Sequence, residues 1–191
     1  MTRIVDRGAI FAGWVGLGMV VVTVIALELI LAVQSLPFLA APLIGGLIGW
    51  YANVRSERWR PWSRVMTNAV YAGLITGLGL ALLYAVVRLV FVFGDSGFRD
   101  ATQGGQLQCR TGPDCTYQRY LAAGGGEELE AVGVTDASSF ERYALRQQAN
   151  GALILIVLAT AGSLMGGAVR GLGGRPKPAG TTLAASHDSV S

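Results

Sequence analysis

Four long apolar stretches limit what this chain of 191 residues can fold into. They cover about residues 8–33, 36–54, 65–94 and 151–171. Each approaches or exceeds the roughly 20 residues that a helix needs to cross the hydrocarbon core of a bilayer. Only 14% of all residues are charged, which is few for a soluble bundle of this size. The sequence therefore predicts an all-α integral membrane protein with four transmembrane helices.

The spacing of these stretches predicts two tandem hairpins in a compact bundle. Residues 1–94 hold three spans, and only a short turn at Ser35 separates the first from the second. A large extracytoplasmic loop, 95–150, comes between the third and fourth spans. Residues 172–191 are rich in Gly, Pro, Ser, Thr and Ala, and we expect them to form a disordered tail.

Arginine and lysine are in excess on one side of the spans, and this bias predicts the orientation of the chain. The basic residues before span one, between spans two and three, and after span four are Arg3, Arg7, Arg55, Arg58, Arg60, Arg64, Arg170, Arg175 and Lys177. The positive-inside rule places both termini in the cytoplasm of a plasma membrane. The net charge of +3 then follows from membrane insertion and does not indicate nucleic-acid binding. Arginine in preference to lysine, with abundant Gly and Ala, fits a GC-rich bacterium.

The two cysteines of the chain, Cys109 and Cys115, both fall in the outer loop. An oxidising exterior favours a disulfide between them, with free or partner-linked thiols, or a redox function, as the alternatives. The single histidine, His187, lies in the tail on the other side, so the sequence predicts neither a metal site nor a cofactor.

The outer loop also contains helix signals. Two short helices are expected at about residues 116–122 and 127–131. The segment from Ser138 to Glu141 matches the Ser-x-x-Glu capping box, which predicts the start of a further helix. That helix should run without a break into span four and project beyond the bilayer.

The chain resembles itself when shifted by sixty residues. Residues 9–13 then fall on 69–73, and Glu28 falls on Arg88. A second match, at an offset near 121, places residues 43–46 on 164–167. These matches indicate two related hairpins, with the outer loop inserted in the second. Matches between Gly- and Ala-rich helices also arise by chance, so the sequence leaves the duplication open.

Glu28 and Arg88 have opposite charges at equivalent positions of two apolar spans. Ionisable groups in lipid usually face a partner, a cavity or a pathway. We predict a structural ion pair that joins the two hairpins. Two alternatives stay open: independent snorkelling of both side chains toward the headgroups, and a functional charge in a cavity or proton path.

Small residues recur at four-residue spacing within the spans, which favours close helix packing. The glycines expected at helix contacts are Gly45, Gly49, Gly73, Gly77, Gly162 and Gly166. The few polar residues in the spans need no special role. In particular, we expect Asn68 to lie near the inner surface without one.

No span combines paired carboxylates, a metal-binding set or a nucleophile beside a base, so we predict no catalytic residues and no enzyme. The first hypothesis for function is a non-catalytic accessory, assembly or structural subunit, which contacts lipid and either a membrane-protein partner or a second copy of itself. The alternative is a small dimeric transporter or channel that uses the region of Glu28 and Arg88. A third is a sensory or ligand-binding outer loop.

Overall fold

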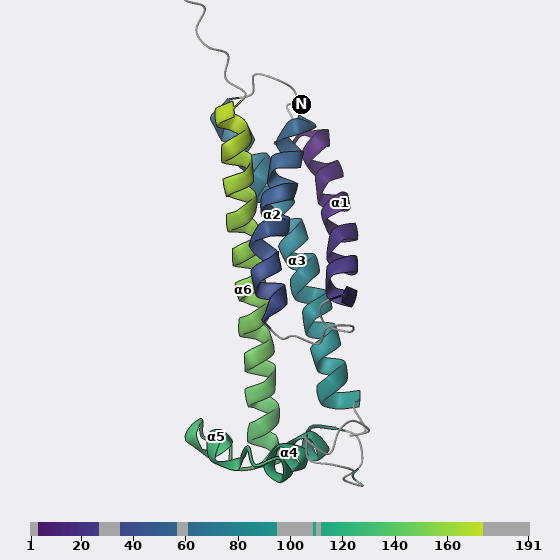
Figure 1. The fold of residues 1–191 in the computed structure, drawn as a ribbon, viewed down its shortest axis with the longest axis vertical. Helices are drawn as coiled ribbons and strands as arrows, with labels where there is room; N and C mark the ends of the chain where they lie inside the picture. The colour runs from purple at the N-terminus through teal and green to yellow at the C-terminus, as the bar shows by residue number, and fades with distance from the viewer. Residues whose placement is uncertain (1–3, 27–34, 57–60, 95–108, 110–111, 174–191) are drawn as a thin grey trace, which may run out of the picture.

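All the regular secondary structure is helical in the residues that the computed structural model describes, which are 4–26, 35–56, 61–94, 109 and 112–173. The helices, drawn in Figure 1, are α1 (Arg7–Val24), α2 (Leu36–Val54), α3 (Trp62–Gly94), α4 (Pro113–Ala122), α5 (Gly126–Ala131) and α6 (Ala137–Gly173). The two short loop helices predicted from the sequence correspond to α4 and α5, and both begin slightly earlier than expected.

Four of these helices, α1, α2, α3 and α6, are long and apolar enough to cross a membrane. Only 28–39% of the residues in the apolar part of each helix are buried inside the protein. Large apolar side chains such as Leu43, Leu82 and Val169 are instead more than 60% exposed. An apolar surface of this extent is unfavourable in water and is stabilised by contact with lipid. The prediction of a four-span integral membrane bundle is confirmed.

The bundle is built from the two predicted hairpins, α1–α2 and α3–α6. Helices α2 and α3 contact each other, α1 packs against both, and α6 packs against both. One buried cluster, which includes Val20, Ala41, Leu80 and Leu155, takes residues from all four helices. The long helices therefore share one core.

The start of α1, the end of α2, the start of α3 and the end of α6 meet at one end of the bundle, which we call the arginine-rich end. Gly8 lies against the backbone of Arg55, and Gly171 lies against the ring of Trp62. Arg64 Nη1 donates to the carbonyl oxygen of Ile4 over 2.8 Å. These contacts bring together all the described segments that the charge bias assigns to one side.

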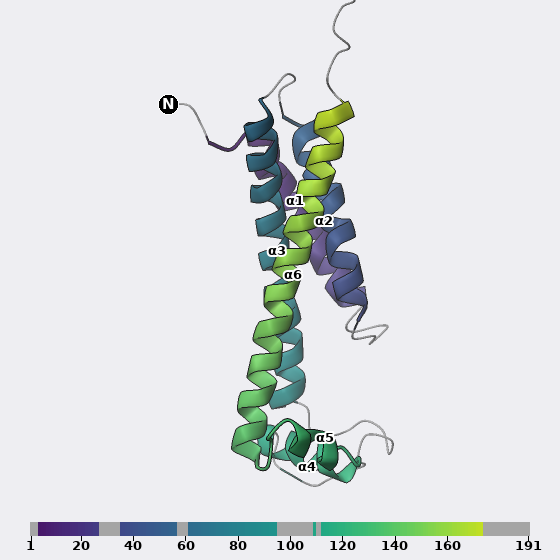
Figure 2. The ribbon, with the colours of Figure 1, turned by 90° about the vertical axis from the view of Figure 1, so that its left-hand side faces the viewer.

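At the opposite end, α3 and α6 extend beyond α2 and the described part of α1, as Figures 1 and 2 show. Helices α4 and α5 lie across the ends of α3 and α6. We call this unit, formed by α4, α5 and the first turns of α6, the cap. As predicted, one continuous helix, α6, begins in the cap and forms the fourth span.

The largest described differences between the helix boundaries and the predicted spans lie at two helix ends. Helix α3 begins at Trp62 rather than at residue 65, because the carbonyl of Pro61 accepts the backbone N–H groups of Arg64 and Val65. Helix α6 continues through Gly173, two residues past the predicted end of span four. Residues 27–33 of the first predicted span and 174–191 of the predicted tail lie outside the described residues.

Candidate functional site

A buried polar network joins α1, α2 and α3 at the arginine-rich end. Asn68 is fully buried, and its Nδ2 donates to Asp6 Oδ2 over 2.9 Å and to Ser56 Oγ over 3.1 Å. In return, the backbone N–H of Asp6 donates to Asn68 Oδ1 over 3.1 Å. The amide side chain of Asn68 therefore connects α3 to Asp6, which precedes α1, and to Ser56, which follows α2. The expectation that Asn68 has no special role was wrong.

The local sequence explains why these groups meet. Asp6 directly precedes the first turn of α1, and its side chain makes no hydrogen bond to that turn. Its carboxyl oxygens are therefore available to Asn68, which lies less than two turns into α3. Asp6 is 9% exposed, so Asn68 satisfies a carboxyl group that the fold removes from water. The sequence alone gives no signal that Asp6 and Asn68, 62 residues apart, are partners.

Two further side chains connect the helices near this network. Asn53 Nδ2 donates to the carbonyl oxygen of Val65 over 3.3 Å, which links α2 to α3. Ser163 Oγ donates to the carbonyl oxygen of Ala69 over 2.6 Å, which links α6 to α3. Such bonds between helices contribute about 0.6 kcal/mol each in membranes. With Asn68, they tie all four long helices together near the arginine-rich end.

Helices α2 and α6 run parallel and touch through four of the predicted glycines. A Cβ atom at Gly45 would meet the backbone of Ala159, and one at Gly49 would meet the backbone of Ser163. In the opposite direction, Gly162 faces the carbonyl group of Pro42, and Gly166 faces that of Gly46. The two helices thus approach until each backbone touches the other, as small-xxx-small sequences allow.

These contacts set the register of α2 against α6, on which the sequence match made no prediction. The pair Gly45 and Gly49 is equivalent to the pair Gly162 and Gly166, which lies 117 positions further along. The match proposed from the sequence used an offset near 121, which is one helical turn longer. Apolar helices with several glycines align almost equally well after a shift of one turn, so only the contacts establish the register.

The two remaining predicted glycines, on α3, also face α6. A Cβ atom at Gly73 would lie 2.9 Å from Cα of Thr160, and one at Gly77 would lie 2.9 Å from Cα of Ile156. Helix α6 is therefore in close contact with α2 on one side and with α3 on another. Through α6, the second hairpin is packed closely against the first.

Arg88 lies on α3 toward the cap, with its Cζ atom 5.4 Å from the ring centre of Tyr84. Tyr84 in turn makes an edge-to-face contact with Phe38 of α2, with the ring centres 5.6 Å apart. The guanidinium group thus has an aromatic neighbour inside a span. Glu28 lies outside the described residues, so its pairing with Arg88 stays a prediction.

The register of α1 against α3 is compatible with that pairing. Gly16 lies against Thr76, and Ile4 accepts a hydrogen bond from Arg64. Both contacts join residues sixty positions apart, which is also the separation of Glu28 and Arg88. The sixty-residue match therefore coincides with a real contact register between the two helices.

If Glu28 and Arg88 form an ion pair, removing either partner should leave an uncompensated charge in a partly buried place. We expect Glu28→Ala and Arg88→Ala each to lower the free energy of unfolding by about 2 kcal/mol. The exchange of both charges, Glu28→Arg with Arg88→Glu, should recover much of that loss. Unfolding in mixed detergent micelles measures these differences. An exchanged protein no more stable than the single variants would refute the pair.

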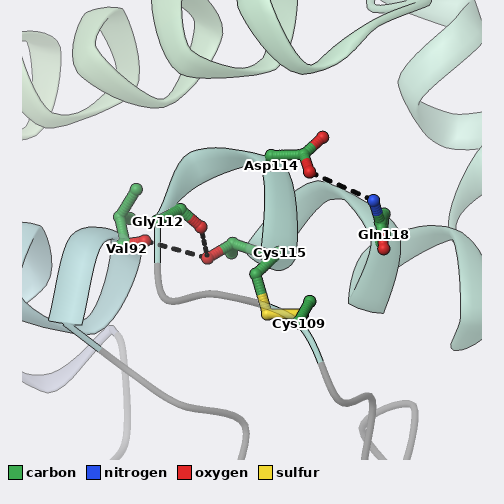
Figure 3. Close-up of a disulfide and its surroundings, with 7 residues drawn as sticks. Val92, Cys109, Gly112, Asp114, Cys115 and Gln118 are labelled. Carbon is green, nitrogen blue, oxygen red and sulfur yellow. Dashed lines mark hydrogen bonds between the residues drawn. A yellow bond between two sulfur atoms is a disulfide. The ribbon is translucent and has the colours of Figure 1, made fainter.

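The cap is attached to α3 beside a disulfide. Cys109 and Cys115 are bonded, with their Cα atoms 5.4 Å apart, so the predicted disulfide is present (Figure 3). Cys115 is fully buried in the first turn of α4. The next residue, Thr116, donates its hydroxyl to the carbonyl oxygen of Val92 over 2.8 Å. The disulfide thus fixes the start of α4 where it can close the end of α3.

The cap has a small core of its own. Leu129, Val134 and Phe140 are buried together, and Tyr117 packs against them. The rings of Tyr117 and Tyr120 lie 5.7 and 5.6 Å from that of Phe140. Since Phe140 belongs to α6, this core attaches α4 and α5 to the fourth span.

The first turn of α6 is capped by Asp136 rather than by Ser138. Asp136 Oδ1 accepts the backbone N–H of Ser139 over 2.7 Å and the hydroxyl of Ser138 over 2.8 Å. In return, Ser139 Oγ accepts the backbone N–H of Asp136 over 3.0 Å. The predicted box from Ser138 to Glu141 was therefore displaced by two residues. An Asp also suits the N-cap position, and only the geometry shows which residue occupies it.

The hydrogen bond from the backbone of Ser139, followed by that from the Ser138 hydroxyl, lowers the pKa of Asp136 below its ordinary value of 3.8. Because its pKa is lowered, Asp136 stabilises the first turn of α6 fully when the pH is above the ordinary pKa of an Asp. This stabilisation is lost as the pH falls through the pKa of Asp136 in the folded protein. We expect Asp136→Ala to speed amide hydrogen exchange in the first turn of α6 at neutral pH. The difference from the wild type should shrink in acid. Glu141→Ala, the control, should leave this turn unchanged, and an equal effect would contradict the assignment.

In the described part of the chain, no three His, Cys, Asp or Glu side chains gather as a metal ion would require. No family model matches the chain, and no curated protein or solved structure matches it either. A function for this protein is therefore inferred from the contacts within the molecule.

Proposed function

We propose that this protein is a non-catalytic membrane subunit whose cap contacts a partner membrane protein. The observation that carries the proposal is the cap itself, which is fixed at the end of α3 and α6 and exposes apolar side chains. These side chains belong to Tyr120, Leu121 and Val132, which are 49%, 42% and 54% exposed.

The cap stands well away from the body of the bundle. Because Gly45 lies against Ala159 in two parallel helices, the start of α2 is level with about residue 150 of α6. The preceding part of α6, back to Ala137, then extends about 20 Å further. Charged residues exposed along this extension, Arg142 and Arg146, fit an aqueous or interfacial environment. Such an environment would leave the cap accessible to a partner outside the hydrocarbon core.

The surface of the cap combines apolar and acidic groups. Leu121 lies near the end of α4, and Val132 directly follows α5. Between them, α5 carries Glu127, Glu128 and Glu130. Protein interfaces commonly have an apolar centre with charged groups at the rim, which set the orientation of the partner. We expect the partner surface to be apolar with basic residues around it.

The packing of the spans supports a structural role in preference to transport. Where α2 and α6 cross, glycines bring the two backbones into direct contact. A helix pair packed in this way is suited to rigidity, whereas cargo binding usually uses broken helices or a polar lining. The transporter or channel alternative is one of the outcomes that the test below distinguishes.

The test is purification of the tagged full-length chain from native membranes in mild detergent. We expect a stoichiometric complex with one membrane protein. Leu121→Glu with Val132→Glu should abolish this complex. Leu172→Glu should preserve it, since Leu172 is also exposed but lies at the arginine-rich end. Recovery of a homodimer alone would contradict the proposal and favour transport, and a complex that survives the double substitution would exclude the cap as its contact.

A further inference from the structure

At the junction of α1 and α2, an arginine side chain is held in place by two aromatic rings. The Cζ atom of Arg55 lies 5.6 Å from the ring centre of Phe11 and 5.4 Å from that of Tyr51. Arg55 Nε also donates to the hydroxyl of Tyr51 over 2.9 Å. Cation–π contacts on two rings restrict the guanidinium group without consuming its terminal N–H donors.

A second arginine, Arg7, is the first residue of α1. Its neighbour Gly8 is in contact with Arg55, and a Cβ atom at Gly8 would be 2.9 Å from Cβ of Arg55. Both arginines are exposed. Within the described residues, the side chain of Arg7 makes no hydrogen bond, and that of Arg55 uses only Nε. The adjacent carboxyl group, on Asp6, is turned to Asn68.

An apolar strip continues from these arginines along α1. Arg7, Phe11, Trp14 and Gly18 follow one another at three- or four-residue spacing, so they share one face of the helix. Phe11 is 52% exposed and Trp14 is 70% exposed, while no side chain comes within 4 Å of a Cβ atom at Gly18. The face thus has a positive end with free donors and an apolar part, from Phe11 to Gly18, about 10 Å long.

We propose that this face binds an anionic phospholipid, with the phosphate on Arg7 and Arg55 and an acyl chain along Phe11 and Trp14. Arginine donors match the oxygen geometry of a phosphate, and two of them lie together here. A soluble phosphate would use only the positive end. A lipid also covers the apolar strip, which is why we assign the site to a lipid.

The test compares two lipids of equal chain length, phosphatidylglycerol and phosphatidylcholine, on the purified full-length protein. Native mass spectrometry should show preferential retention of phosphatidylglycerol. Each arginine near anionic lipid contributes roughly a fivefold preference, so Arg7→Gln with Arg55→Gln should reduce retention by more than tenfold. Arg142→Gln with Arg146→Gln, two exposed arginines toward the cap, should leave retention unchanged.

Three further measurements distinguish lipid binding at this face from misfolding of the variant and from recognition of phosphate alone. Unfolding in phosphatidylcholine should be similar for the wild type and the Arg7/Arg55 variant, which shows that the variant is folded. Trp14→Ala should weaken retention of the lipid, because it removes part of the apolar strip. Equal retention of the two lipids by the wild type would overturn the proposal. The proposal would also be overturned if millimolar inorganic phosphate abolished retention of phosphatidylglycerol while Trp14→Ala had no effect on it. That result would show that the site recognises phosphate alone.

Discussion

Gly166→Ala should lower the free energy of unfolding by about 2 kcal/mol relative to Gly18→Ala. At Gly166, the new methyl group would meet the backbone of Gly46, which no side-chain rotation can relieve. At Gly18, the methyl group would meet nothing within 4 Å. Both substitutions change helix propensity by the same amount, so their difference isolates the contact between α2 and α6.

This difference can be measured by titrating the folded protein in mild detergent with sodium dodecyl sulfate and following the loss of helix contacts. Gly162→Ala should behave like Gly166→Ala, since it faces the backbone of Pro42 in the same interface. Equal stability of the Gly166 and Gly18 variants would mean that α2 and α6 do not touch at this position.

Asn68→Leu should lower the free energy of unfolding by about 3 kcal/mol. Leucine has a similar volume, but it removes both hydrogen bonds that join Asn68 to Asp6 and leaves a buried carboxyl group without them. Asn150→Leu replaces an exposed asparagine of α6 and should have little effect. The same detergent titration compares the two.

A double substitution separates the polar pair from simple repacking. If the cost of Asn68→Leu comes from the hydrogen bonds that Asp6 loses, then Asp6→Ala with Asn68→Leu should be more stable than Asn68→Leu alone. If the two substitutions add independently, Asp6 and Asn68 are not coupled, and their hydrogen bonds do not explain the cost of Asn68→Leu.

The sequence predicted the spans well, because burial in lipid imposes a length and a composition on each helix. The four apolar stretches correspond to α1, α2, α3 and α6, and the cap helices were found from local signals. The disulfide was also predicted, since Cys109 and Cys115 are close in the sequence and are the only two cysteines of the chain.

Contacts between distant residues were harder to predict. Nothing in the sequence pairs Asp6 with Asn68, because each is also explained by its own position near a helix start. The N-cap residue of α6 was predicted to be Ser138 and is Asp136, because both residue types fit an N-cap. The glycines of α2 and α6 were named from the sequence but the register in which they meet was not, because glycines recur at one-turn spacing in both helices. In each case, local patterns allowed several solutions, and tertiary packing selects one of them.

The most direct measurement of the central claim is site-specific photo-crosslinking in intact cells. A photoreactive side chain placed at Leu121 in the cap should form one discrete adduct with a second membrane protein. The same group at Leu74, exposed on the membrane-spanning part of α3, should give no such adduct. A discrete adduct from Leu74 with none from Leu121, or an adduct of Leu121 only with another copy of this chain, would contradict a role for the cap in binding a partner.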